Sequence, residues 1–205
     1  QGRVIGFGGR SLDGGEPKYL NSPETELFEK GKHLFGLERA SAAIRKDDRA
    51  VVVEGYFDVI ALHAAGITNA VAALGTALSS QQITQLCRCC ESRRLILNFD
   101  SDGAGVRAAQ RAIGEVEQLA LQGQLELRVL HLPAGKDPDE FLKTQGAGDY
   151  RALLDQAPLW LDWQIEQVLE GRDLARPDQF QQAVSALVAL LGKLPQSAVR
   201  SHYLQ

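Results

Sequence analysis

The feature that most constrains this fold is a regular alternation, between residues 50 and 146, of short apolar runs and segments with helical spacing. The apolar runs, such as "AVVV" and "LILNF", are typical of strands that are buried on both faces. Each run is followed by a segment whose apolar residues recur every three or four positions. This alternation predicts an α/β fold with a parallel sheet wrapped by helices, because parallel strands need crossover connections.

Turn residues and helix caps separate these expected elements. Gly66 ends the first helix of the alternating region, and Ser79 or Ser80 begins the second. The expected strands are 50–54, 70–74, 94–99 and 125–132, and the expected helices are 56–66, 79–92, 104–124 and 137–146.

Two flanking regions differ from the alternating one. Before residue 49, glycine-rich extended pieces precede a brief helix starting near Ser22 and Pro23 and a second helix over 37–47. After residue 149 the strand patterns stop and only helical patterns remain. The sequence therefore predicts three parts, with boundaries near residues 48 and 148.

Composition and charge exclude several classes of protein. No run approaches the roughly 18 apolar residues of a transmembrane helix, and the first residues lack the order of a signal peptide. The net charge of −4 argues against a general polyanion binder. Residues 1–50, however, carry nine Lys and Arg against eight Asp and Glu. A nucleic-acid surface is therefore expected to be local and near the N-terminus.

The three cysteines, Cys87, Cys89 and Cys90, fall within one helical turn. An odd number at this spacing cannot form a disulfide framework, and no second cluster completes a zinc site. We expect small packed residues in a reducing cytoplasm. The chain has no methionine and starts at Gln1, which indicates a piece of a longer protein.

Carboxylates gather where the expected strands end. In an open parallel sheet, ligands bind beyond the carboxyl ends of the strands. Like charges at one edge raise one another's pKa values unless a cation compensates them. A hard divalent cation with oxygen ligands, Mg²⁺ above all, fits this site best. The carboxylates are Glu54, Asp58, Asp100, Asp102, Asp137 and Asp139.

Several of these carboxylates also have structural explanations. Ser101 or Asp102 suits the cap of the helix that follows, and Asp137-Pro138 is a good helix start. The spacing excludes an EF-hand, no Walker-type phosphate loop occurs, and the histidines are scattered. Glu54 is hardest to explain structurally, because a charge that ends a buried strand needs compensation.

Three segments, in this order, resemble the Toprim module of topoisomerases, primases and related nucleases: "VVVEGYFDVIAL", "NFDSDGAG" and "KDPDE". The flanking segments "GRVIGFGGR", "PKYLNSPET" and "FEKGKHLFGL" are similar to one branch only, the bacterial DnaG-type replicative primases. The resemblance covers residues 2–142, and the helical tail is similar in kind. Small departures at Phe57, Ser101 and Lys136 remove no carboxylate.

The resemblance implies a DNA-directed RNA polymerase that makes short RNA primers from NTPs on single-stranded DNA, by Mg²⁺-dependent nucleotidyl transfer in which Mn²⁺ substitutes. The implied catalytic residues and principal metal ligands are Glu54, Asp100 and Asp102, and Asp58, Asp137 and Asp139 would complete the acidic site. The implied nucleotide- and DNA-binding groove comprises Arg10, Lys18, Tyr19, Asn21 and Lys30.

The resemblance also implies what lies outside this chain. Zinc is expected only in a domain of the full-length protein, and the replicative helicase is expected to bind through a region absent here. The chain would be an incomplete catalytic core of a cytoplasmic, bacterial primosome protein. Its parts would be an N-terminal basic subdomain segment (1–48), a Toprim catalytic domain (49–148) and a truncated helical subdomain (149–205).

Two other functions fit part of the sequence. A phosphohydrolase of the haloacid-dehalogenase type also has a strand followed by DxDG, with Asp100 as nucleophile and Asp102 as acid and base. That interpretation leaves Glu54 and "PKYLNSPET" unexplained. A non-catalytic Toprim-like module would bind DNA or partner proteins, but such a module does not need the full set of acids.

Overall fold

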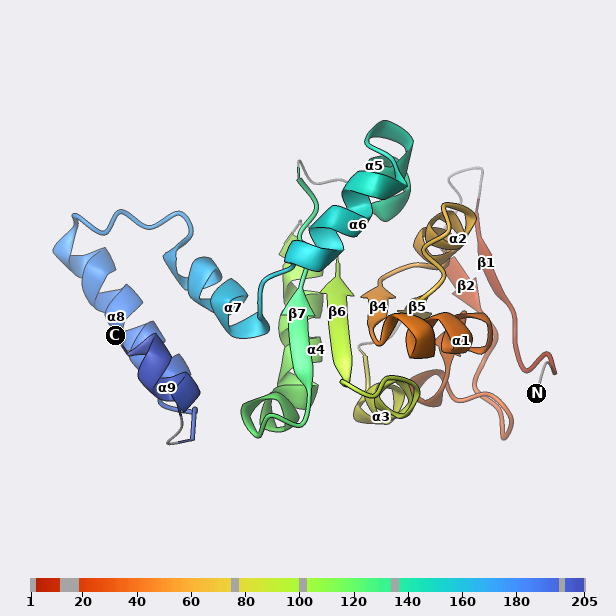
Figure 1. Ribbon diagram of the computed structural model, residues 1–205, viewed down its shortest axis with the longest axis horizontal. Coiled ribbons are helices and arrows are strands. Elements are labelled where there is room, and N and C mark those ends of the chain that lie inside the picture. The colour runs from red at the N-terminus through yellow and green to blue at the C-terminus, as the bar shows by residue number, and fades with distance from the viewer. Residues whose placement is uncertain are drawn as a thin grey trace.

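A five-stranded sheet with helices on both faces forms the centre of the fold (Figure 1). The structure is a computed structural model, and it describes residues 3–11, 19–74, 78–99, 103–133, 137–195 and 198–204. The strands, in spatial order, are β3 (Leu34–Phe35), β5 (Ala70–Ala73), β4 (Ala50–Val53), β6 (Arg94–Asn98) and β7 (Glu126–Val129).

Four of the five strands run parallel, as the sequence predicts. β4 lies between β5 and β6, and β6 pairs with β7. The edge strand β3 was not expected. It pairs antiparallel with β5, and its two residues are too few for an alternating pattern to be visible in the sequence. The predicted α/β fold is confirmed, with one antiparallel strand added at the edge.

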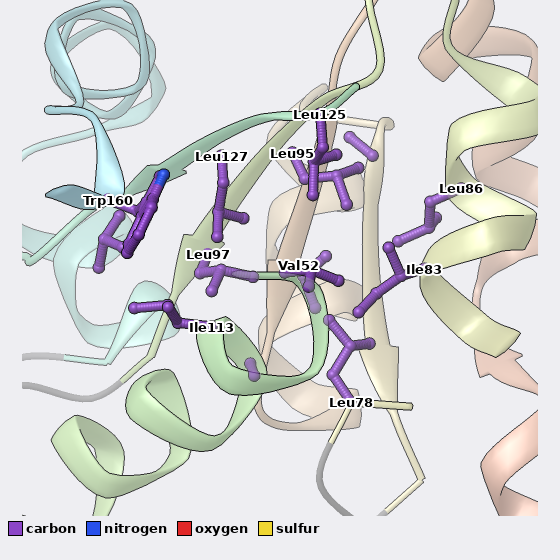
Figure 2. Packing of buried hydrophobic residues seen from close by; sticks show 14 of the residues in the cluster. Val52, Leu78, Ile83, Leu86, Leu95, Leu97, Ile113, Leu125, Leu127 and Trp160 are labelled. Atoms are coloured by element: carbon purple, nitrogen blue, oxygen red, sulfur yellow. The ribbon is translucent and has the colours of Figure 1, made fainter. Parts of the chain in front are cut away.

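The two faces of the sheet are covered by different helices. Successive strand side chains point to opposite faces, so Val52, Leu97 and Leu127 share one face. Figure 2 shows them packing against Ile83 and Ile113. The helices on this face are α1 (Leu37–Asp47), α3 (Ser80–Cys89), α4 (Gly103–Leu121) and α7 (Trp160–Leu169).

The opposite face carries the residues one position along each strand. Val51, Val53 and Ile96 are fully buried there, in contact with a second set of helices. These helices are α2 (Tyr56–Ala64), α5 (Pro138–Thr144) and α6 (Ala147–Gln156). Full burial on both faces explains why the strands are almost continuously apolar in the sequence.

The N-terminal region contains one wrong prediction. No helix begins at Ser22. Instead, Thr25 and Phe28 form an isolated bridge, and the Thr25 hydroxyl accepts a hydrogen bond from the Phe28 N–H (3.1 Å). This side-chain bond closes a tight turn in place of a first helical turn. The other elements of the region are β1 (Gly8–Arg10), β2 (Tyr19–Asn21) and the 3₁₀ helix η1 (Lys30–Lys32).

The C-terminal region is helical, as expected. After α7 come α8 (Pro177–Leu191) and α9 (Ala198–Tyr203), which extend beyond the β7 edge of the sheet (Figure 1). An isolated bridge between Arg128 and Leu159 joins this region to β7. Within the described ranges, none of the helices combines the length and apolar character needed to cross a membrane.

Candidate active site at the carboxyl edge of the sheet

The strand order reverses between β4 and β6, so their carboxyl ends form a topological switch point. The connection from β4 passes through α2 on one face, and the connection from β6 passes through α4 on the other face. Ligands of open α/β sheets bind at such a topological switch point. Val53 pairs with Asn98 at this position, so Glu54 and Phe99 follow neighbouring strands. Asp100 and Asp102, the predicted principal ligands, lie outside the described residues.

Glu54 and Asp58 form an acidic corner where β4 turns into α2. Glu54 is exposed directly after a strand whose four residues are fully buried. Asp58 accepts a hydrogen bond from the N–H of Gly55, the N-cap of α2, at 3.0 Å. This bond satisfies a backbone group that the helix leaves unpaired. Asp58 therefore stabilises the turn between β4 and α2, and this role does not depend on a bound cation.

The segment around Asp137 has the structural role that its sequence suggests. Asp137 caps α5 by accepting a hydrogen bond from the Glu140 N–H at 2.7 Å. Asp139 forms an exposed ion pair with Lys143 at 2.6 Å. α5 packs against α2, which brings this segment to the side of the sheet that carries Asp58. In the described parts of the chain, no three acidic, histidine or cysteine side chains are grouped as a metal site.

A buried polar pair, Asn98 and Tyr150, stabilises the end of β6, the strand that leads into Asp100. Asn98, which is 1% exposed, accepts a hydrogen bond from the Tyr150 hydroxyl (2.6 Å) and donates one to the Leu130 carbonyl (3.2 Å). Burial, with a smaller effect of the Asp58 charge, raises the pKa of Tyr150 far above its usual range. The pair connects the ends of β6 and β7 to α6. Nothing in the sequence marks Asn98 or Tyr150 for this role.

Replacing Tyr150 with phenylalanine tests this pair. The substitution leaves the Asn98 amide oxygen buried without a partner, so we expect the free energy of unfolding to fall by about 1–2 kcal/mol. Tyr203→Phe is the matched control, because its hydroxyl donates to Asp162 at the same distance, 2.6 Å, in a less buried position. Urea unfolding should show the larger loss for Tyr150→Phe. Equal losses would contradict the stabilising role of the pair.

The N-terminal strands contact the first turn of α2, between Glu54 and Asp58 in the chain. The Tyr56 hydroxyl of α2 donates a hydrogen bond to Asn21 of β2. Gly8 of β1 approaches the Tyr56 ring so closely that a Cβ there would lie 2.6 Å from it. The Arg10 guanidinium lies 5.2 Å from the centre of the Phe57 ring. The structure thus brings two of the predicted basic-groove residues, Arg10 and Asn21, to the segment that carries Glu54 and Asp58.

The remaining groove residues are placed less directly. Lys18 lies outside the described residues, and Tyr19 is described only as the first residue of β2. Lys30 begins η1, which is anchored to α3 because Gln82 donates hydrogen bonds to the carbonyls of Lys30 (2.9 Å) and His33 (2.6 Å). Gln82 is fully buried, although in the sequence it resembles a surface helix residue. The spacing of Ser79 and Gln82, a capping box, was the available signal.

Three protein-family models match successive parts of the chain. The N-terminal domain of the DNA primase catalytic core matches residues 1–41, and a Toprim-like model matches residues 51–142. The DnaB-helicase binding domain of primase matches residues 161–205. The sequence resemblance placed the helicase-binding region outside this chain, whereas this match places a model of it on α7, α8 and α9.

Known proteins and structures agree with these matches. The DNA primase of Synechococcus elongatus is 67% identical over 203 residues, which are 99% of this chain and 29% of the relative. A DnaG primase catalytic domain bound to single-stranded DNA is 37% identical, with a TM-score of 0.81, and the match covers 99% of this chain and 64% of that one. The Aquifex aeolicus primase, solved with its zinc-binding and RNA polymerase domains, is 35% identical with a TM-score of 0.76, over 98% of this chain and 46% of that one.

These coverages also show which part of a primase the chain represents. It spans about a third of the length of the curated relatives that it matches. It spans 64% of the DnaG catalytic domain, and the match includes nearly all of this chain. The chain therefore belongs to the bacterial DnaG-type primases and corresponds to a part of their catalytic core that contains the Toprim domain.

Proposed function

We propose that this chain carries the polymerising site of a primase, which makes short RNA primers from NTPs on single-stranded DNA. The observation that supports this most strongly is the position of the acidic corner. Glu54 lies at the switch point of the sheet, next to the strand that leads into Asp100 and Asp102, and the N-terminal strands bring Arg10 to Phe57 in the following turn of α2. This arrangement supports a site in which carboxylates hold a cation and Arg10 contacts a polyanion.

The donor set at this edge fits a hard divalent cation. Glu54 and Asp58 supply only carboxylate oxygens, which are the ligands that Mg²⁺ and Mn²⁺ prefer. Two carboxylates alone are too few for an all-protein site, and the described residues contain no group of three. We propose that Asp100 and Asp102 add to this pair, and that substrate phosphates complete the shell. Asp137 and Asp139 would act at its periphery, because their carboxylates already cap α5 and pair with Lys143.

The residues of the chain would then act as follows. A bound divalent cation would lower the pKa of the primer 3′-hydroxyl and neutralise charge on the reacting phosphate. Glu54, Asp100 and Asp102 would hold the cation at the switch point, and Asp58 would keep the β4–α2 turn in position through Gly55. Arg10, Lys18 and Lys30 would bind the triphosphate or the template backbone, with Tyr19 and Asn21 beside them.

The proposed function is tested by incorporation of labelled NTPs on single-stranded DNA with Mg²⁺ or Mn²⁺. We expect the 205-residue chain to incorporate nucleotides and Asp100→Ala to lose this activity. A wild-type chain that binds metal and NTP without incorporating them would show that this part of the core needs the rest of the protein. Hydrolysis of a phosphatase substrate, or DNA binding that is lost in Lys18→Ala but indifferent to Mg²⁺, would favour the two rival functions instead.

A further inference from the structure

Two successive aromatic residues at the start of α2 face different surroundings. Tyr56 points into the protein, where its ring packs on Phe35 with centroids 4.9 Å apart and its hydroxyl reaches Asn21. Phe57 is 40% exposed, although burying a phenylalanine normally stabilises a fold. Ile60, one turn further along the same helix face, is 53% exposed. The sequence therefore places an apolar surface beside Glu54 and Asp58 that the core does not use.

The exposed ring of Phe57 is also oriented by a cation. The Arg10 guanidinium lies over the ring, 5.2 Å from its centre. A guanidinium at this distance is attracted to the face of the ring. Gly8, two residues before Arg10, packs against the Tyr56 ring and fixes β1 beside α2. The position of the cation over the ring is thus set by the docking of β1.

We propose that Phe57 and Arg10 form a stacking platform for a base of the single-stranded DNA template. This inference rests on the proposed function, and it adds base stacking to the contacts proposed for the acidic residues and the basic groove. Unpaired bases stack on exposed aromatic rings and on guanidinium planes, in a manner that tolerates any sequence. Phe57 lies between Glu54 and Asp58 in the chain, so a strand whose base stacks on the ring would pass beside the proposed metal site. A template base is favoured over the base of a free nucleotide because a relative with this fold binds single-stranded DNA.

The test compares two oligonucleotides with equal numbers of phosphates, one of thymidines and one of abasic sites. Fluorescence anisotropy with the 205-residue chain should show about tenfold tighter binding of the thymidine strand. Phe57→Ala should remove most of this preference, Phe57→Trp should retain it, and Phe57→Met should resemble alanine because it keeps the bulk without the ring. Phe180→Ala, at a 52% exposed phenylalanine on α8, is the matched control and should change nothing.

Salt dependence separates the two members of the platform. Arg10→Ala should weaken binding of both strands and reduce the slope of log Kd against log salt by about one, because the guanidinium over the ring would also neutralise a backbone phosphate. Phe57→Ala should leave that slope unchanged, because a ring neutralises no phosphate. An Arg10→Ala variant with an unchanged slope would overturn the role of the cation.

Three outcomes would overturn the platform in different ways. Equal wild-type affinity for both strands, with normal NTP incorporation, would refute the platform and leave the primase function standing. A higher KM for NTP in Phe57→Ala, with unchanged affinity for DNA, would assign the ring to the nucleotide instead. A wild-type chain that binds neither strand and incorporates no NTP would refute the proposed function together with the platform.

Discussion

Glu54→Gln is expected to lower NTP incorporation at least about a hundredfold, which corresponds to about 3 kcal/mol of transition-state stabilisation. The same change should leave the free energy of unfolding equal or higher. Glutamine keeps the size of the side chain, but it removes one negative charge from a corner that Asp58 shares, and so relieves repulsion between carboxylates when no cation is bound. Loss of activity with a gain in stability is typical of a residue kept for chemistry.

Incorporation assays and thermal unfolding in metal-free buffer measure the two effects separately. Glu91→Gln is the matched control, because Glu91 is exposed and lies before β6, at the amino end of the sheet rather than at the carboxyl end. Both of its values should match the wild type. If Glu54→Gln incorporated NTPs normally, or lost stability in proportion to activity, Glu54 would be a structural residue.

Gln82→Leu is expected to cost about 2–4 kcal/mol of folding stability. The Gln82 amide is fully buried and makes three hydrogen bonds. It accepts one from the Ser79 N–H (2.9 Å) and donates the other two to the carbonyls of Lys30 and His33. Leucine fills a similar volume, so the loss would come from backbone groups left without partners rather than from a cavity. The same substitution should weaken binding of single-stranded DNA, because η1 carries Lys30.

The neighbouring residue provides the control for this prediction. Gln81 has the same side chain on the same helix, but it is exposed, so Gln81→Leu should change stability by less than about 0.5 kcal/mol. Urea unfolding of both variants measures the difference. Coincident unfolding midpoints would show that solvent replaces the Gln82 bonds and that α3 does not anchor η1.

The sequence predicted those parts of the molecule in which a local pattern and a tertiary role coincide. β4 is an unbroken apolar run, and α2 has apolar residues at helical spacing. Burial on both faces of the sheet could therefore be inferred from these patterns alone. The prediction of a helix at Ser22-Pro23 was wrong, because the Thr25 hydroxyl closes a turn that propensity does not reveal. The antiparallel pairing of β3 depends on a neighbour 39 residues away, Leu34 opposite Ala73, and leaves no local trace.

The candidate site divides in the same way. The position of Glu54 follows from strand polarity, which a sequence pattern fixes. The contacts of Asn98 and Phe57 do not, because an asparagine or phenylalanine next to an acidic motif is compatible with many surroundings. The packing of α6 buries Asn98 against Tyr150. The packing of β1 leaves Phe57 exposed, with Arg10 over its ring.

The antiparallel edge strand has a consequence for how this protein can be shortened. β3 covers the outer edge of β5, and α1 covers one face of the same sheet, yet both precede the apolar runs that identify the catalytic domain in the sequence. A chain trimmed to begin at Ala50 would keep every acidic residue of the site. It would also expose unpaired N–H and C=O groups along β5, which invites strand pairing between copies. Self-association of such a fragment would therefore reflect the loss of β3 from the edge of the sheet rather than a misfolded active site.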